Sequence, residues 1–185
     1  MPKIAEQRSK SKEQSSPLSR HSRVGGNPVK QIELKELLRQ IAANYPDYEF
    51  IESAHFSWHA GKRHVSYKKA SKNTTHDIFA LLHELGHAIL GHADYKHDIE
   101  LLQLEVAAWD KARELAAHYG VALDEDYVQD CLDTYRDWLH LRATCPTCFA
   151  RSLQTSDKRY RCFNCGAEWS VTRSRLCRPY RLQKS

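Results

Sequence analysis

Two histidines and the glutamate between them are the residues of this 185-residue chain best suited to chemistry. His83, Glu84 and His87 form a His-Glu-x-x-His motif within a run, 74–90, whose pattern predicts a helix. Residues four apart lie on one face of a helix, so both imidazoles can bind one metal ion. Glu84 would lie beside that ion and could take a proton from a water bound to it. On zinc, the pKa of such a water is about 7, which provides a nucleophile at neutral pH.

The residues around the motif predict a capped and buried helix. Thr74 and Asp77 have the spacing of a capping box, and Gly91 is a natural helix stop. The apolar residues between them form one broad face: Ile78, Leu81, Leu82, Leu85 and Ile89. The alternative, in which His83 and His87 are ordinary histidines of a core helix, is less favoured because the spacing, the intervening Glu and the apolar flanks agree.

A second carboxylate, Glu105, is the predicted third metal ligand. It lies in a run, 98–119, that predicts the next helix. The other residues of its stripe are apolar: Leu101, Ala108, Ala112 and Leu115. An unpaired carboxylate against a core costs on the order of several kcal/mol, and a metal ion held by the preceding helix would remove that cost. Exposure of Glu105 to solvent, or its pairing with a basic side chain, stays open. The other candidates for third ligand are His92, Asp94, His97 and Asp98.

The chain before the motif predicts one helix, at 28–44, and then a β-hairpin. The expected strands are 48–58 and 63–68, joined by a short turn. Three histidines are expected on the exposed faces of these strands and not at a metal: His55, His59 and His64. After the motif, a further helix is expected at 124–142, with Cys131 as a buried thiol on its apolar face.

Four of the six cysteines form two C-x-x-C pairs, which strongly favour a four-Cys zinc ribbon with a β-hairpin between the pairs. They are Cys145, Cys148, Cys162 and Cys165. A unit this small cannot bury a sufficient core, so metal binding would have to stabilise it. The pairs favour zinc in a reducing, cytoplasmic compartment, and redox-active or disulfide-bonded cysteines are the less favoured alternative. No role is assigned to Cys177.

Charge divides the chain into an acidic body and two basic ends. The net charge is +5 over residues 1–30, −7 over 31–142 and +7 over 143–185. The basic residues of the last part are Arg151, Lys158, Arg159, Arg161, Arg173, Arg175, Arg178, Arg181 and Lys184. Such a surface could contact the phosphates of a nucleic acid, although a run of charge is more often only solvated.

The first 28 residues are rich in Ser, Lys and Arg, so we expect them to be disordered. Residues 21–28 resemble translations of short repeats found between bacterial genes. Two interpretations stay open, that the natural start lies downstream or that the segment is a genuine basic tail. No hydrophobic stretch typical of a signal peptide is visible, and no run of about 18 apolar residues predicts a membrane span.

These motifs resemble the zincin metallopeptidases. The string His-Glu-Leu-Gly-His, followed by a helix in which Glu105 precedes Ala108, is most similar to the ImmA/IrrE group over about residues 30–120. That group consists of intracellular bacterial peptidases that cleave transcriptional repressors. The order of parts also resembles SprT-like proteins, in which a zinc ribbon, here including 160–166, follows the motif and which cleave DNA-bound proteins. The resemblance further implies that a strand before the active-site helix pairs with the substrate backbone.

The expected fold class is α+β, with a mostly helical zincin-like metallopeptidase domain that contains a small β-hairpin or sheet, followed by a C-terminal zinc ribbon. The expected boundaries are 1–28 for the disordered basic segment, 29–142 for the metallopeptidase domain, 143–171 for the ribbon and 172–185 for a basic tail.

The expected activity is hydrolysis of peptide bonds in a protein substrate. Two zinc ions are expected, a catalytic one held by His83, His87 and Glu105 and a structural one held by the four paired cysteines. Glu84 would act as general base and then donate the proton to the leaving amine. The candidates for stabilising the oxyanion are His118, Tyr119 and Tyr95.

The competing expectation is a non-catalytic zinc-containing module that binds nucleic acid or regulates other proteins. A fourth protein ligand beside His83 and His87, such as His92 or His97, would favour that module, whereas a three-ligand site favours an enzyme. A peptidase that stays latent until a partner or DNA opens its groove is the third possibility.

Overall fold

The computed structural model describes residues 32–69, 75–172 and 182–183. These residues form four α-helices and two small β-sheets, so the fold class is α+β, as predicted. Several predicted features lie outside the described residues: the segment 1–28, Thr74 of the capping box, Cys177 and the basic residues from Arg173 onward.

The helices agree closely with the predicted runs. They are α1 (Leu34–Asn44), α2 (Thr75–Ile89), α3 (Asp98–His118) and α4 (Glu125–Ala143). The last three begin and end within one residue of their predicted bounds. Within the described part of the chain, no helix combines the length and the apolar character needed to cross a lipid bilayer.

The first sheet corrects the predicted hairpin. It contains β1 (Glu49–Ser53), β2 (Ser57–His59) and β3 (His64–Lys68) in the order β1-β3-β2. The single strand predicted at 48–58 is two strands, because the chain bends at residues 54–55 and the two halves pair with opposite edges of β3. Only β2 forms a hairpin with β3, while β1 pairs with β3 in parallel. Alternation of apolar residues continues through the bend, so the pattern alone could not reveal it.

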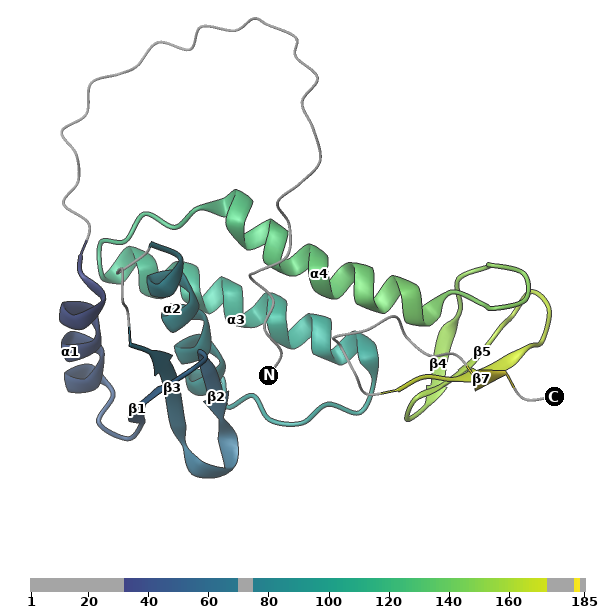
Figure 1. Ribbon diagram of the computed structural model, residues 1–185, viewed down its shortest axis with the longest axis horizontal. Coiled ribbons are helices and arrows are strands. Elements are labelled where there is room, and N and C mark those ends of the chain that lie inside the picture. Colours follow the sequence, from purple (N-terminus) through teal and green to yellow (C-terminus); the bar gives the residue numbers. More distant parts are fainter. Residues whose placement is uncertain (1–31, 70–74, 173–181, 184–185) are drawn as a thin grey trace, which may run out of the picture.

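The second sheet confirms the hairpin predicted between the cysteine pairs. Its strands are β4 (Leu153–Ser156), β5 (Arg159–Arg161), β6 (Glu168–Ser170) and β7 (Leu182–Gln183), all paired antiparallel in that order. In Figure 1, α1 and the first sheet lie at one end of the molecule, the second sheet lies at the other, and α3 and α4 run between them.

The core brings α2 against α3 and against the first sheet. The apolar face predicted for α2 is buried, with Ile89 half-buried at its end. Gly86 permits a close approach between the helices, since a Cβ added there would lie 2.6 Å from the carbonyl oxygen of Ala108. Ala108 and Ala112 on α3 are fully buried. Small residues on both helices therefore let their backbones approach closely just beside the motif.

A buried ion pair joins α3 to α4, and the ribbon contacts this pair through hydrogen bonds. Arg142, near the end of α4, contacts both carboxylate oxygens of Asp98, the first residue of α3, at 2.6 and 3.2 Å. The Tyr160 hydroxyl of β5 donates to the same carboxylate at 2.6 Å. Arg142 also donates to the Thr172 carbonyl and stacks on the Trp138 ring. All charges at this junction are thus paired, as burial of ionised groups requires.

Candidate metal centres

His83, His87 and Glu105 converge in the interior, as the sequence predicts. Glu105 Oε2 lies 3.1 Å from His83 Nε2 and 3.5 Å from His87 Nε2, and the two Nε2 atoms are 3.1 Å apart. All three side chains are buried. The His83 ring packs on Trp109 of α3, with their ring centroids 4.3 Å apart. One nitrogen or oxygen from each residue therefore points to a common centre, which makes the three a candidate metal-binding group.

The rival ligands have other partners or lie apart from this centre. His97 Nδ1 contacts Glu100 Oε1 at 3.0 Å, and the Glu100 carboxylate in turn accepts the His97 backbone N–H, so both residues cap α3. Asp98 is engaged by Arg142 and Tyr160 in the junction. Asp94 is exposed on the loop after α2.

Glu84 lies next to the group without belonging to it. Its carboxylate accepts the backbone N–H of Trp58, on β2, at 2.7 Å. Burial raises the pKa of Glu84 to about 7, with a smaller contribution from Glu105, while His87 and the Trp58 N–H oppose the rise. An edge strand thus holds a carboxyl group that can gain or lose a proton near neutral pH.

Glu105 is held in the opposite electrostatic state. Burial by itself raises the pKa of this carboxyl, but hydrogen bonds from His83 and His87 outweigh burial and keep the pKa well below its usual range. Glu105 is consequently an anion at neutral pH, which is the form that binds a cation.

His92 contacts a candidate ligand, His87, and the sequence did not predict this contact. It was considered as a rival ligand, but its Nδ1 lies 2.8 Å from Nδ1 of His87, on the side of that ring away from the converging atoms. Burial, and then the neighbouring His87, lower the pKa of His92. The available indication was Gly91, because a glycine in the left-handed conformation after a helix folds the next residue back over the last turn.

Two of the candidates for oxyanion stabilisation lie far from the group. His118 ends α3 more than three turns beyond Glu105, which is roughly 20 Å along the axis. Tyr119 follows it, and its hydroxyl accepts a hydrogen bond from Asn44 of α1. Tyr95, half-buried on the loop between α2 and α3, stays a prediction.

The three histidines expected on the faces of the first sheet are in neither candidate metal group of the described residues. His59 is exposed, whereas His55 and His64 are half-buried rather than exposed. His59 Nε2 lies 2.9 Å from the Ser57 hydroxyl, and its ring packs against His64 with centroids 4.4 Å apart. Cys131 is also half-buried, at the edge of the core.

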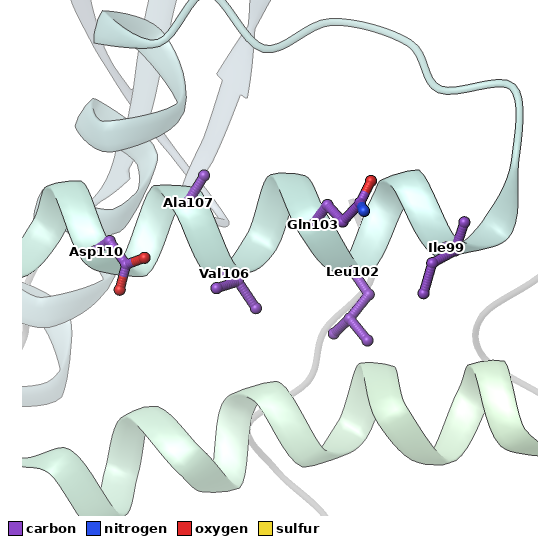
Figure 2. A pocket seen from close by; sticks show the side chains of 6 residues that line it. All are labelled: Ile99, Leu102, Gln103, Val106, Ala107 and Asp110. Carbon is purple, nitrogen blue, oxygen red and sulfur yellow. The ribbon is translucent and has the colours of Figure 1, made fainter.

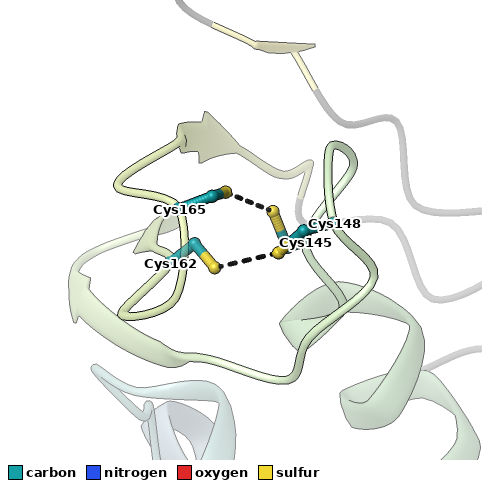
Figure 3. A group of neighbouring side chains, drawn as sticks. All are labelled: Cys145, Cys148, Cys162 and Cys165. Atoms are coloured by element: carbon teal, nitrogen blue, oxygen red, sulfur yellow. Dashed lines mark hydrogen bonds between the residues drawn. The ribbon is translucent and has the colours of Figure 1, made fainter.

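The four paired cysteines form the second candidate metal group (Figure 3). The sulfur of Cys145 lies 3.7 Å from that of Cys165, and the sulfurs of Cys148 and Cys162 are 3.5 Å apart. Cys145 and Cys162 are buried. The backbone N–H of Cys165 lowers the pKa of the Cys162 thiol, which favours the thiolate form that binds metals.

A shallow apolar groove of about 320 Å³ lies on α3, away from both metal groups. Figure 2 shows its lining on one helix, with Leu102 and Val106 pointing toward α4. Ala107 and Asp110 continue the lining. Because Glu105 points to the opposite, buried side of α3, this groove is not part of the metal centre.

No protein-family model, curated protein or solved structure matches the chain. Its function is therefore argued from the two metal groups and the residues around them.

Proposed function

We propose that the protein is a zinc metallopeptidase that hydrolyses peptide bonds of a protein substrate at His83, His87 and Glu105. The observation that carries the proposal is this buried group with the Glu84 carboxyl directly beside it. Among the described residues the group has three members, the number typical of catalytic zinc, whereas the cysteine group has four, as structural zinc does. This difference favours an enzyme over a purely structural pair of zinc sites.

The spacing of the side chains supports zinc at both centres. Tetrahedral zinc with bonds of about 2.05 Å to N and O separates its ligand atoms by about 3.3 Å. The three distances at the first centre are 3.1, 3.1 and 3.5 Å. Zinc–sulfur bonds of about 2.3 Å separate sulfurs by about 3.8 Å, and the cysteine pairs lie 3.7 and 3.5 Å apart.

Glu84 carries the proton in the proposed reaction. A bound zinc ion supplies a water of lowered pKa and polarises the peptide carbonyl. Glu84, buried beside the group, would accept the proton of the attacking water and return it to the leaving amine. The Trp58 N–H fixes this carboxyl during the transfer. Glu105 stays ionised and offsets the positive charge of the centre.

A substrate strand would bind along β2. This strand is an edge of the first sheet, and its Trp58 already contacts Glu84. Addition of an extended peptide to such an edge satisfies the backbone groups of both strands. These features agree with the zincin resemblance of the sequence, and we propose a zincin-like peptidase unit over residues 29–142.

Substitution of Glu84 by Gln tests the mechanism. The amide keeps the shape but cannot accept the proton, so cleavage of an unfolded protein such as casein should fall by at least about 100-fold. Zinc content should stay that of wild type. Glu114→Gln, the same change on the exposed side of α3, should leave both unchanged. Retained cleavage in Glu84→Gln would refute the mechanism.

The ribbon is proposed to contact nucleic acid. Phe149 and Phe163, each next to a paired cysteine, are 73% and 74% exposed. Arg151, Arg159 and Arg161 are exposed on the same small unit. Exposed aromatic rings among cations suit stacking on bases with phosphate contacts. This surface would bring the peptidase to a nucleic-acid-bound substrate, or would serve as the main function if the first centre is inactive.

Binding of a labelled single-stranded oligonucleotide tests this partner. The affinity should fall with added salt and should fall further, by about 10-fold or more, in Phe149→Ala with Phe163→Ala. Leu141→Ala removes another exposed apolar side chain, 45% exposed, from α4 and should have no effect. Equal weakening by all three substitutions would argue against a stacking surface.

A further inference from the structure

We propose that His92 is the positioning residue that fixes the orientation and the tautomer of His87, an inference that rests on the proposed function. His87 is the second histidine of the motif, and His92 follows it five residues later. His92 itself contributes no atom to the converging group. Its role would be to hold a ligand in place rather than to bind the ion.

The two ring nitrogens of His87 face different partners. Nε2 points to the common centre, 3.1 Å from His83 Nε2 and 3.5 Å from Glu105 Oε2. Nδ1 points away from it and lies 2.8 Å from Nδ1 of His92. The two rings are steeply inclined, at 72°, with centroids 4.9 Å apart. Their contact is therefore an edge-on hydrogen bond between nitrogens and not a stack of faces.

The tautomers follow from the lone pairs. A neutral imidazole has one protonated nitrogen. When a metal ion takes the place of the proton that His87 Nε2 shares with Glu105, Nε2 binds the ion through its lone pair, and the ring proton must be on Nδ1. That N–H donates to Nδ1 of His92, which accepts with its own lone pair and carries its proton on Nε2. One hydrogen bond thus selects the tautomer of both rings, as outer-shell partners of metal ligands commonly do.

Backbone contacts hold His92 in the accepting position. Gly91 adopts a left-handed conformation, with φ of +65°, immediately after α2. The Gly91 N–H donates to Ala88 O and the His92 N–H donates to His87 O, which is the hydrogen-bond pair of a Schellman motif. The His92 carbonyl accepts the indole N–H of Trp58 at 2.7 Å. Both the backbone N–H and the backbone carbonyl of His92 are therefore held by hydrogen bonds.

The other histidine ligand has no comparable support. His83 Nδ1 is buried and has no hydrogen-bond partner among the described residues. Its ring is placed by packing on Trp109 instead. Within the described part of the chain, the hydrogen bond from His87 to His92 is therefore the one outer contact of this type at the two histidines. Its loss should weaken metal binding.

The test is zinc affinity of the full-length protein, measured by competition with a chelator, in three variants. His92→Phe keeps a ring of similar size but has no acceptor. His92→Asn places Oδ1 near the position of the lost Nδ1. His140→Phe makes the same change as the first variant at an exposed site on α4. The readout is the affinity for the zinc at His83, His87 and Glu105. This zinc should be removed first, because the four cysteines are expected to bind theirs more tightly.

We expect His92→Phe to lower the zinc affinity of the His83, His87 and Glu105 group by about 10- to 100-fold. His92→Asn should recover most of that affinity, and His140→Phe should have the affinity of wild type. Equal affinities of His92→Phe and wild type would overturn the role of His92. Equal weakness of the Phe and Asn variants would also overturn it, by showing that ring bulk and not the acceptor matters. A wild-type protein that binds only one zinc would refute the proposed function itself. Failure of the proposed function is thus distinguishable from failure of the His92 role, in which wild type binds two zinc ions.

Discussion

Glu84 lies beside the candidate metal group and Glu105 belongs to it, and their neighbours hold these two buried carboxyl groups in opposite states. Glu84 has a pKa of about 7 because burial outweighs the opposing effects of His87 and of the Trp58 N–H. Two imidazoles keep the pKa of Glu105 well below the usual range despite burial. Environments that move the pKa values of two carboxyl groups in opposite directions suit them to different roles, which in the proposed reaction are proton carrier for Glu84 and permanent anion for Glu105. Helical spacing made both residues predictable as site residues. Their protonation states were not predictable, because they depend on burial and on contacts between residues that only the fold brings together.

Glu105→Gln tests the assignment of the permanent anion. The amide has nearly the same volume but no charge, so the centre loses the anion that attracts the cation. Zinc affinity at this centre should fall by about 100-fold or more, while the ribbon keeps its own zinc. Zinc titration with a chelator measures both sites, and Glu114→Gln is the matched control. Wild-type affinity in Glu105→Gln would exclude this residue as a ligand.

The packing of α2 on α3 determines whether the ligands meet. Each helix was predictable from its apolar period, but their close approach depends on Gly86, whose missing side chain leaves room for the Ala108 carbonyl. The first sheet was harder to predict because β1 and β2 share one apolar period across a bend. The bend places Trp58 on the edge strand, where its backbone N–H donates to Glu84.

Gly86→Ala tests this close approach. Replacing Gly by Ala within a helix stabilises it by about 1 kcal/mol, whereas overpacking costs about 1–3 kcal/mol. The new Cβ would lie 2.6 Å from a backbone oxygen, which can yield only if α3 moves, so the overpacking cost should exceed the gain. We expect a lower free energy of unfolding in urea and weaker zinc binding at His83 and His87. Gly61→Ala, where a Cβ meets no atom within 4 Å, should change neither quantity. Unaltered stability and zinc binding in Gly86→Ala would contradict the packing argument.

At the scale of the whole molecule, the two metal centres are joined through α3. Asp98 begins this helix at the ribbon junction, and Glu105 lies two turns further along it. Arg142 and Tyr160 reach Asp98 from α4 and from the ribbon. The sequence predicted a ribbon after a helical unit, but the junction combines residues far apart in the chain and left no local pattern. Asp98, a candidate metal ligand by its position in the sequence, is instead the shared partner of Arg142 and Tyr160.

Asp98→Asn should therefore destabilise the whole chain. It leaves the guanidinium of Arg142 buried without its anion, which costs about 3–5 kcal/mol. Tyr160→Phe removes one hydrogen bond to the carboxylate and should cost about 1.5–3 kcal/mol. Asp110→Asn, at an exposed ion pair with Arg113, should cost less than about 1 kcal/mol. Urea unfolding followed by circular dichroism gives all three values. Similar values for the two Asp variants would mean that the junction does not stabilise the fold.

The zinc content of purified wild type and of His83→Ala tests the central claim most directly. The account predicts two zinc ions per chain in wild type and one in His83→Ala, because the variant breaks the first centre and leaves the four cysteines intact. One zinc in both proteins would contradict it, since only the ribbon would then hold metal and the peptidase proposal would fail.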